Sequence, residues 1–310
     1  MHPKVCMPNS ETLQRALRYL HYGGMVAIPT ETVYGLATNA ANGEAVAQVY
    51  AAKGRPNFNP LIAHVANLKR AKSEGVFSDM AVALAEAFWP GPLTLVVPVA
   101  PTSIVSTLAL AGLDSIALRV PAHPVTIELL SAFGSPLVAP SANPSGKISP
   151  TTAEHVAADM GDHVDLILDG GPSQAGVEST IIDARGERPA LLRPGSLTVE
   201  QIEAVWPGLI RPKADPKAPR SPGQMLRHYA PRAALRLNAI APEDGEAYLG
   251  FGPGAATLSL SETGDLNEAA ANLFSMLRRL DACYDRIAVA PLPETGLGEA
   301  LNDRLTRAAK

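Results

Sequence analysis

The sequence predicts an α/β protein with two domains joined by a basic, proline-rich linker. Short apolar or β-branched runs alternate with helical patterns over the first two thirds of the 310 residues, which is typical of a largely buried sheet covered by helices. Over residues 207–231 prolines are too dense for a helix or a central strand. We therefore expect a first α/β domain over residues 1–206, a linker over residues 207–231 and a second domain over residues 232–310.

The first domain is expected to begin with a helix and a strand. Ser10 can cap a helix that has Leu13 and Leu17 on one face, and Gly23 ends this helix before an apolar strand over residues 25–28. Further strands are expected over residues 61–65, 93–97, 115–120, 136–139, 164–168 and 179–182, and further helices over residues 45–52, 80–88, 124–133 and 152–160.

The linker and the second domain follow. Arg211, Lys213, Lys217, Arg220 and Arg227 face only one acid within residues 207–231, so this segment is a basic arm that could close over an anionic ligand. After it, apolar runs over residues 234–237, 247–251 and 286–289 predict strands, and residues 267–280 predict a helix. The second domain is expected to be a small Rossmann-like α/β unit.

Composition narrows the functional classes. The net charge of −4 argues against a surface that coats nucleic acid, so contact with a polyanion must come from a local basic patch. Cys6 and Cys283 are far apart and have no Cys or His partner at metal spacing, which excludes a disulfide framework and a zinc site. There is no basic segment followed by an apolar one at the start and no apolar run near ~20 residues. We expect a cytoplasmic protein that is neither exported nor inserted into a membrane.

Two loops indicate an anion-binding pocket. Residues 53–60 (KGRPNFNP) contain the cations Lys53 and Arg55 and no acid, and we expect Lys53 on a loop that solvent can reach. Residues 140–147 (PSANPSGK) offer hydroxyl, amide and ammonium donors of the kind that hold phosphate or carboxylate oxygens. Together they predict one pocket built from distant segments.

Common nucleotide and hydrolase motifs are missing from the sequence. There is no G-x-x-x-x-G-K-[ST] loop, which argues against a P-loop kinase or ATPase. Residues 250–254 (GFGPG) have the wrong spacing for a dinucleotide turn and are expected to form a plain turn. Ser141 is not within a G-x-S-x-G elbow, so the motif that would best support a serine hydrolase is missing.

The role of each polar residue at a strand end is ambiguous when that residue is considered alone. Thr32 follows a strand and could contact a substrate or only satisfy turn amides. His64, inside an apolar strand, could be a ligand or a core histidine. Arg119 and Arg193 close apolar runs, and each needs water, an ordinary salt bridge or a carboxylate ligand. Their convergence with Lys53 and Arg55 predicts one crevice lined by groups that bind anions.

The ordered set of motifs resembles the threonylcarbamoyl-adenylate synthase family. The segments that carry the resemblance are residues 28–36 (IPTETVYGL), 53–56 (KGRP), 88–94 (FWPGPLT), 118–121 (LRVP), 139–143 (APSAN) and 177–181 (VESTI). Residues 221–231 (SPGQMLRHYAP) resemble the linker of the long, two-domain form, although QML stands where a more basic or aromatic run is expected. The resemblance implies a twisted mixed sheet with a positively charged concavity.

The resemblance also implies a reaction and a set of site residues. L-threonine, bicarbonate and ATP would give threonylcarbamoyl-AMP and pyrophosphate, for the modification of an adenosine beside the tRNA anticodon. Threonine would be held by Thr32, His64, Arg119, Ser179 and the backbone at Ala139. ATP would be held by Lys53, Arg55, Asn59, Ser115, Ser141, Asn143, Ser149, Arg193 and, from the linker, Tyr229, with Lys53 and Arg55 as the catalytic cations.

Further expectations concern cofactors and partners. Mg²⁺ is expected to arrive with ATP, because the sequence has no dedicated acid cluster and no protein-bound metal is expected. A downstream threonylcarbamoyl transferase complex would receive the product, and contact with tRNA is possible. Two alternatives stay open: a factor that binds double-stranded RNA or tRNA without synthase chemistry, and an acyl or carbamoyl hydrolase that uses Ser141 or His64.

Overall fold

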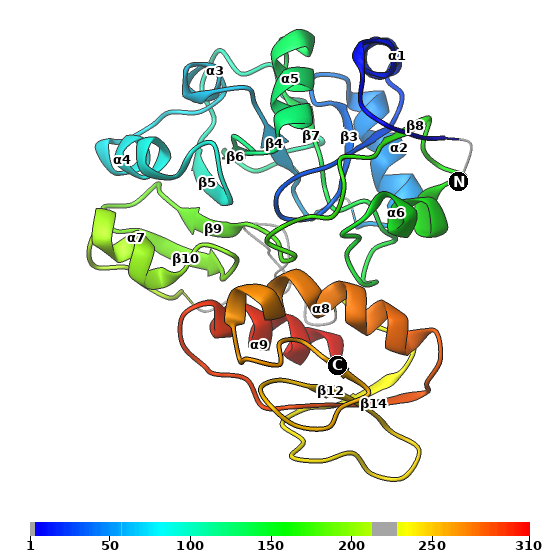
Figure 1. Ribbon diagram of the computed structural model, residues 1–310. Helices are drawn as coiled ribbons and strands as arrows, with labels where there is room; N and C mark the ends of the chain where they lie inside the picture. The colour runs from blue at the N-terminus through cyan, green and yellow to red at the C-terminus, as the bar shows by residue number, and fades with distance from the viewer. Residues whose placement is uncertain (1–3, 57, 213–227) are drawn as a thin grey trace.

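A computed structural model describes residues 4–56, 58–212 and 228–310, which form two α/β units. The N-terminal unit is the upper one in Figure 1, and the C-terminal unit lies below it. Most of the linker, residues 213–227, falls outside the described residues, and with it Lys213, Lys217, Arg220 and Arg227 of the basic arm. The two-unit α/β architecture agrees with the fold class predicted from the sequence.

A ten-stranded mixed sheet forms the centre of the N-terminal unit. Its strands are β1 (Val5–Cys6), β2 (Val26–Ile28), β3 (Gly35–Asn39), β4 (Ile62–His64), β5 (Leu93–Pro98), β6 (Ser115–Arg119), β7 (Leu137–Val138), β8 (Leu166–Leu168), β9 (Thr180–Asp183) and β10 (Ala190–Arg193). Their order across the sheet is β1-β8-β2-β3-β7-β4-β6-β5-β9-β10. Parallel pairs such as β4 with β6 alternate with antiparallel pairs such as β5 with β6, so the sheet is mixed.

Seven helices accompany this sheet among the described residues. They are α1 (Ser10–His21), α2 (Gly43–Lys53), α3 (Leu68–Glu74), α4 (Asp79–Phe88), α5 (Pro124–Phe133), α6 (Ala153–Met160) and α7 (Val199–Val205). The apolar sides of α1 and α5 share one buried cluster with β2, β7 and β8. Side chains of α2, α3, α4, α6 and α7 join a second, larger cluster. Helices therefore pack on both faces of the sheet, as is usual for a sheet with buried strands.

The alternation of side chains along β4 and β6 creates the face that carries the polar site. Ala63 and Leu118 are buried in the larger cluster. Successive side chains of a strand point to opposite faces, so Ile62, His64 and Arg119 point the other way. His64 and Arg119 are register partners at the ends of the two strands. A histidine and an arginine thus lie side by side on a face that the helices of the larger cluster do not cover.

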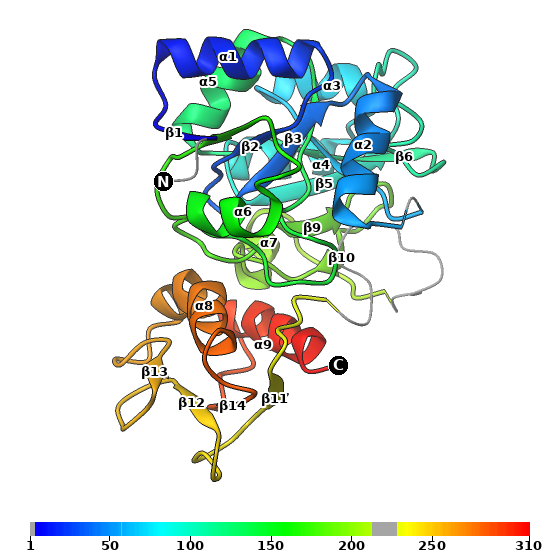
Figure 2. The same cartoon turned by 90° about the vertical axis from the view of Figure 1, so that its right-hand side faces the viewer.

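The C-terminal unit is a parallel sheet with two helices on one side. Its strands are β11 (Ala234–Arg236), β12 (Ala247–Gly250), β13 (Leu258–Ser259) and β14 (Arg286–Val289), in the order β11-β14-β12-β13, and its helices are α8 (Leu266–Asp281) and α9 (Leu297–Ala308). Figures 1 and 2 both show α8 and α9 between this sheet and the N-terminal unit. Val33, Ile148 and Val177 of the N-terminal unit belong to the same buried cluster as Phe274 and Leu301 of these helices. The two units therefore share a hydrophobic core.

The predicted elements agree with the structure except at a few places. Asn9, not Ser10, caps α1, because its side chain accepts from the Thr12 amide while its own backbone is extended. The sequence did not predict β1, β3, β13, α3, α7 and α9, and it indicated β10 only as the apolar run that Arg193 closes. None of the helices that the structure describes combines the length and apolar character that a membrane crossing requires.

Candidate active site

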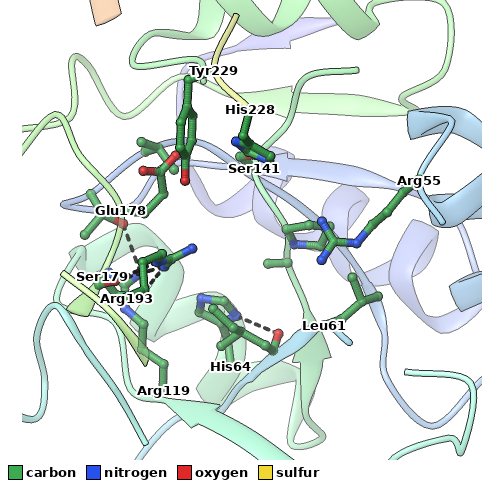
Figure 3. Close-up of a pocket in the computed structure, with 15 residues that line it drawn as sticks. Arg55, Leu61, His64, Arg119, Ser141, Glu178, Ser179, Arg193, His228 and Tyr229 are labelled. Carbon is green, nitrogen blue, oxygen red and sulfur yellow. Dashed lines mark hydrogen bonds between the residues drawn. The ribbon is translucent and has the colours of Figure 1, made fainter. Parts of the chain in front are cut away.

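A pocket of about 530 Å³ lies where the polar face of the large sheet meets the C-terminal unit. Its lining comes from Thr32, Val33, Arg55, Leu61, Ile62, His64, Arg119, Ala139, Pro140, Ser141, Glu178, Ser179, Arg193, His228 and Tyr229. Figure 3 shows Arg55 and Arg193 on opposite sides, His64 between them and lower, and His228 and Tyr229 entering from the other end.

Arg119 is held by a network at the end of β6. It donates from Nη1 to the Thr32 hydroxyl at 2.9 Å, from Nη2 to Glu31 at 2.5 Å and from Nε to the Gly91 carbonyl at 3.2 Å. The second carboxylate oxygen of Glu31 accepts from the Ala122 amide. Burial acts to raise the pKa of Glu31, but Arg119 outweighs it and the pKa is lowered. The salt bridge that the sequence left open for Arg119 is therefore present, and Glu31 is its partner.

His64 is a neutral imidazole in this setting. Burial and the neighbouring Arg119 lower its pKa to about 3. Its Nδ1 lies 3.3 Å from the carbonyl of Ile62, which can only accept, so Nδ1 carries the proton. Nε2 is then an acceptor, and His64 lines the pocket. This arrangement suits a ligand that brings an N–H donor, such as an amino group.

Arg193 closes β10 and braces Ser179. Its Nε and Nη2 donate to the Ser179 carbonyl at 3.2 and 2.9 Å, and Nη2 also donates to the Ser179 hydroxyl at 3.1 Å. The hydroxyls of Ser179 and Thr94 are 2.7 Å apart. Burial lowers the pKa of Arg193 from its usual value. Arg193 is therefore held by the backbone and hydroxyl of Ser179, and no salt bridge of Arg193 is seen among the described residues.

Arg55 enters from the loop after α2. Gly54 ends this helix in the left-handed conformation, with φ 57° and ψ 34°, which glycine adopts without strain. Arg55 then donates to the carbonyls of Asn59 at 3.2 Å and Pro60 at 2.9 Å. Burial lowers the pKa of Arg55 to about 10, so it remains a cation at neutral pH. The prolines of this loop and the two hydrogen bonds fix the direction of the guanidinium.

The prediction that Lys53 lies on a loop that solvent can reach is wrong. It is the last residue of α2 and only 3% exposed, and its ammonium donates to the carbonyls of Ser141 and Asn143. Burial, followed by the charge of Arg55, lowers its pKa well below the usual value. The expectation failed because burial of a helix end depends on the distant loop over residues 140–147, which local sequence does not reveal. Lys53 ties this loop to α2 behind the pocket wall.

Most of the predicted site residues meet in the pocket, and the others lie outside its lining. The lining includes Thr32, Arg55, His64, Arg119, Ala139, Ser141, Ser179, Arg193 and Tyr229, and it does not include Lys53, Asn59, Ser115, Asn143 and Ser149. Ser149 donates to Glu178, which lines the pocket, at 2.6 Å. Ser115 shares the strand face of Arg119 but starts β6, about 13 Å away at ~3.3 Å per residue.

Tyr229 and His228, at the end of the linker, reach the pocket beside the C-terminal unit. Tyr229 has a positive φ of 64°, is buried and stacks on Phe274 of α8 with ring centroids 5.5 Å apart. Its hydroxyl has no hydrogen-bond partner among the described residues. Burial raises the pKa of Tyr229 to about 12 and lowers that of His228 to about 3, so both side chains are neutral. The Tyr229 hydroxyl is therefore a donor that a ligand can use.

Sequence reasoning missed four residues at this site. Glu31, Glu178 and His228 lie within motifs that were quoted, so the signal was present but carried no assigned role. Arg304 of α9 donates to Glu178 at 2.7 Å and lies outside every motif. A long-range ion pair of this kind leaves no local pattern in the chain.

The fold and the pocket define an α/β protein with a pocket lined by three buried arginines. Residues 18–195 match the family model described as "Telomere recombination", and residues 197–310 match the model described as "Threonylcarbamoyl-AMP synthase, C-terminal domain". The chain is 39% identical to the threonylcarbamoyl-AMP synthase of Bacillus subtilis, over 97% of this chain and 94% of the relative. It is 40% identical to that of Pyrococcus abyssi, over 95% and 93%.

A solved structure agrees with these relatives. The crystal structure of P. abyssi Sua5 complexed with L-threonine superimposes with a TM-score of 0.90 at 37% identity, covering 98% of this chain and 96% of the other. The chain therefore belongs to the threonylcarbamoyl-AMP synthase family, in its two-domain form.

Proposed function

We propose that this protein is an enzyme that converts L-threonine, bicarbonate and ATP into L-threonylcarbamoyl-AMP, pyrophosphate and water. This is a nucleotidyl transfer and the first step in forming threonylcarbamoyladenosine beside the tRNA anticodon. The family membership supports the reaction. The observation that carries it is the convergence of Arg55, Arg119 and Arg193, from segments far apart in the chain, on one pocket.

The half of the pocket around Arg119 is suited to threonine. Three of the five N–H donors of Arg119 are used on Thr32, Glu31 and Gly91, which leaves one N–H on each terminal nitrogen for a ligand carboxylate. The accepting Nε2 of His64 fits the amino group, and the hydroxyls of Thr32 and Ser179 with the backbone at Ala139 fit the remaining polar atoms. The P. abyssi relative, at 37% identity, was solved as a complex with L-threonine, which supports threonine as a ligand of this protein.

The half between Arg55 and Arg193 is suited to the phosphates of ATP. Both guanidinium groups lie in the lining, and Ser141 and the Tyr229 hydroxyl add donors. Lys53, Asn59, Asn143 and Ser149 are assigned to the same ligand through the loops that they brace. Ser115 is assigned to a more distant part of the nucleotide along the same strand face.

The chemistry requires that two anions be brought together. The amine of threonine is first carboxylated to a carbamate, whose oxygen then attacks the α-phosphorus as the bond to pyrophosphate breaks. Repulsion between the carbamate and the phosphates, and loose positioning, are the main barriers. Arg55 and Arg193 would stabilise the developing charge on phosphorus and on the departing pyrophosphate, and Lys53 fixes the loop beside them. The reaction needs no covalent intermediate on the protein.

Mg²⁺ would arrive with the nucleotide, bound to phosphate oxygens. Within residues 4–56, 58–212 and 228–310 no group of three or more His, Cys, Asp or Glu side chains is placed to hold a metal ion. The carboxylates nearest to the pocket, Glu31 and Glu178, are engaged by Arg119 and Arg304. Phosphate oxygens are ligands that Mg²⁺ commonly uses in such sites.

The product would be handed to a downstream threonylcarbamoyl transferase complex in the cytoplasm, which also brings the tRNA. A direct role as an RNA-binding factor fits the pocket less well. Arg55, Arg119 and Arg193 are each less than 10% exposed, so they cannot line up against the phosphates of an RNA helix. A small nucleotide can reach them inside the pocket.

The proposal is tested by measuring pyrophosphate release from ATP. Release is expected only when both threonine and bicarbonate are present, and mass spectrometry should detect threonylcarbamoyl-AMP. Lys53→Ala is expected to reduce this release by about a hundredfold, since the loop at Ser141 loses its brace. The exposed cation Arg188 supplies a matched control, Arg188→Ala, with unchanged release. Release that is independent of threonine or bicarbonate would reject the synthase reaction.

A further inference from the structure

A buried ion pair in the pocket wall joins the two units of the protein. Nε of Arg304, on α9, donates to Oε2 of Glu178 at 2.7 Å, and both side chains are buried. Glu178 directly precedes Ser179 and lines the pocket, beside Tyr229 and above Arg193 in Figure 3. The C-terminal unit thus supplies a charge to the wall of a pocket that is otherwise built largely by the N-terminal unit.

The same guanidinium makes two more contacts at the proposed ATP side of the pocket. Nη2 of Arg304 donates to the carbonyl of Pro194, the residue after Arg193, at 2.9 Å. The guanidinium carbon lies 5.1 Å from the centroid of the Tyr229 ring, within cation–π distance. One side chain of α9 therefore braces a carboxylate, a backbone carbonyl and an aromatic ring. Tyr229 is assigned to ATP, Pro194 adjoins Arg193, and Glu178 is hydrogen-bonded to Ser149, and both Arg193 and Ser149 are assigned to ATP.

Glu178 is a carboxylate in a pocket proposed to receive a triphosphate. Its Oε1 accepts from the Ser149 hydroxyl at 2.6 Å, so that oxygen is held in place. Without Arg304 the ionised carboxylate would face the phosphates in a medium of low dielectric, where like charges repel strongly. Arg304 neutralises this charge while it holds the Glu178 side chain against the wall.

We propose that Arg304 is a positioning residue for ATP, which acts by neutralising Glu178 and by bracing Tyr229 and the backbone at Pro194. The inference rests on the proposed function, and it makes the C-terminal unit part of the nucleotide site. Arg304 does not line the pocket, so it acts through residues that do.

A double-mutant cycle tests this role. The proteins are wild type, Arg304→Met, Glu178→Gln and the double variant, each full length, and the readouts are kcat and the KM values for ATP and for threonine. Arg304→Met is expected to raise the KM for ATP by about a hundredfold, because it leaves a buried carboxylate unpaired. The KM for threonine should change by less than about threefold, since Arg119 is untouched. The double variant should recover at least about tenfold of the loss, because position 178 no longer carries a charge and Asp303, the other carboxylate that Arg304 contacts, keeps its ion pair with Arg307.

The outcomes separate positioning from a merely structural role. A double variant as impaired as Arg304→Met, or equal losses for both substrates, would overturn the inference. The control is Arg286→Met, which removes an exposed arginine of the same unit at the start of β14 and should leave every constant unchanged. If Arg304→Met does not fold, Arg304→Lys replaces it, because lysine keeps the charge but not the fork. About a tenfold rise in the KM for ATP then supports the inference, and an unchanged KM overturns it.

The same experiment keeps the inference apart from the proposed function. If wild type releases no pyrophosphate with threonine, bicarbonate and ATP, the proposed function has failed. If wild type is active and the cycle shows no rescue, only the role of Arg304 has failed.

Discussion

Two arginine–glutamate pairs lie at the pocket, and they are built differently: both members of the Arg304–Glu178 pair are buried, whereas Glu31 of the Arg119–Glu31 pair is partly buried. Arg119 and Glu31 both belong to the N-terminal unit and are 2.5 Å apart. Arg304 and Glu178 come from different units and are 2.7 Å apart. The first pair is complete when the large sheet has formed, whereas the second forms only when the C-terminal unit is docked.

This difference indicates that the two units support different parts of the pocket. The large sheet fixes the groups proposed to bind threonine, since His64 and Arg119 are strand neighbours and Thr32 is hydrogen-bonded to Arg119. The proposed ATP side also depends on α8 and α9, which hold Tyr229 and Glu178. We therefore expect changes in the C-terminal unit to affect ATP more than threonine.

Breaking the pair inside the N-terminal unit should have the largest effect. Arg119→Met removes the proposed clamp for the threonine carboxylate and leaves the partly buried Glu31 without its ion-pair partner. We expect kcat/KM for threonine to fall about a thousandfold and the free energy of unfolding to fall by about 3–5 kcal/mol. Enzyme kinetics and urea denaturation measure both, with the more exposed Arg185→Met as control. An unchanged KM for threonine would show that Arg119 does not hold the substrate.

Separating the two units should have the next largest effect. Gly176 has a φ of 68°, and a Cβ there would lie 2.1 Å from the carbonyl of Ala270 in α8. Gly176→Ala should therefore push α8 away and lower the free energy of unfolding by about 3 kcal/mol. It should also raise the KM for ATP. Gly171→Ala is the matched control, because its φ is 80° but a Cβ there meets nothing within 4 Å. Gly171→Ala should lower the free energy of unfolding by only about 1 kcal/mol. Equal effects of the two variants would argue against a docked C-terminal unit.

The dependence of stability on pH should reveal the pair between the units. Burial acts to raise the pKa of Glu178, but Arg304, Arg193 and the Ser149 hydroxyl outweigh it and lower the pKa to about 2. A lowered carboxyl pKa stabilises the fold fully above pH ~4.5, and this contribution, on the order of 3 kcal/mol, is lost as the pH falls toward 2. Thermal unfolding between pH 6 and 3 should show a shallower decline for Glu178→Gln than for wild type. Parallel declines would mean that the Glu178 carboxylate is not stabilised by its partners.

An exposed pair between the units should have the smallest effect. Arg211, at the start of the linker, is bonded to Glu299 of α9, and its side chain is 55% exposed. Water screens such a pair, so Arg211→Ala should change the free energy of unfolding by less than about 0.5 kcal/mol. Chemical denaturation at low and high salt measures this. If Arg211→Ala lowered the free energy of unfolding as much as Arg304→Met does, burial would not be what distinguishes the Arg211–Glu299 pair from the Arg304–Glu178 pair.

Local patterns predicted most of the sheet, and the resemblance to a known family supplied most of the candidate site residues. Apolar runs located β4 and β6, and the arginine that closes β6 lines the pocket. The strand β3 was missed because its residues, Gly35–Asn39, lack β-branched and aromatic side chains apart from Thr38, and it forms by pairing with β2 and β7.

The remaining features depend on contacts between distant segments. Glu178 and Arg304 are separated by 126 positions, and no periodicity links them. Lys53 is buried only because the loop at Ser141 lies across the end of α2. Burial and long-range charge pairing are properties of the folded chain, so a sequence without its fold does not show them.

The central claim is that threonine and ATP occupy one arginine-lined pocket. A crystal structure with threonine and a non-hydrolysable ATP analogue tests it most directly. We predict the threonine carboxylate on Arg119, the phosphates between Arg55 and Arg193, and the amine close enough to the α-phosphorus for one carbamate group to bridge them. Ligands bound in separate cavities, or an amine turned away from the phosphates, would contradict the account.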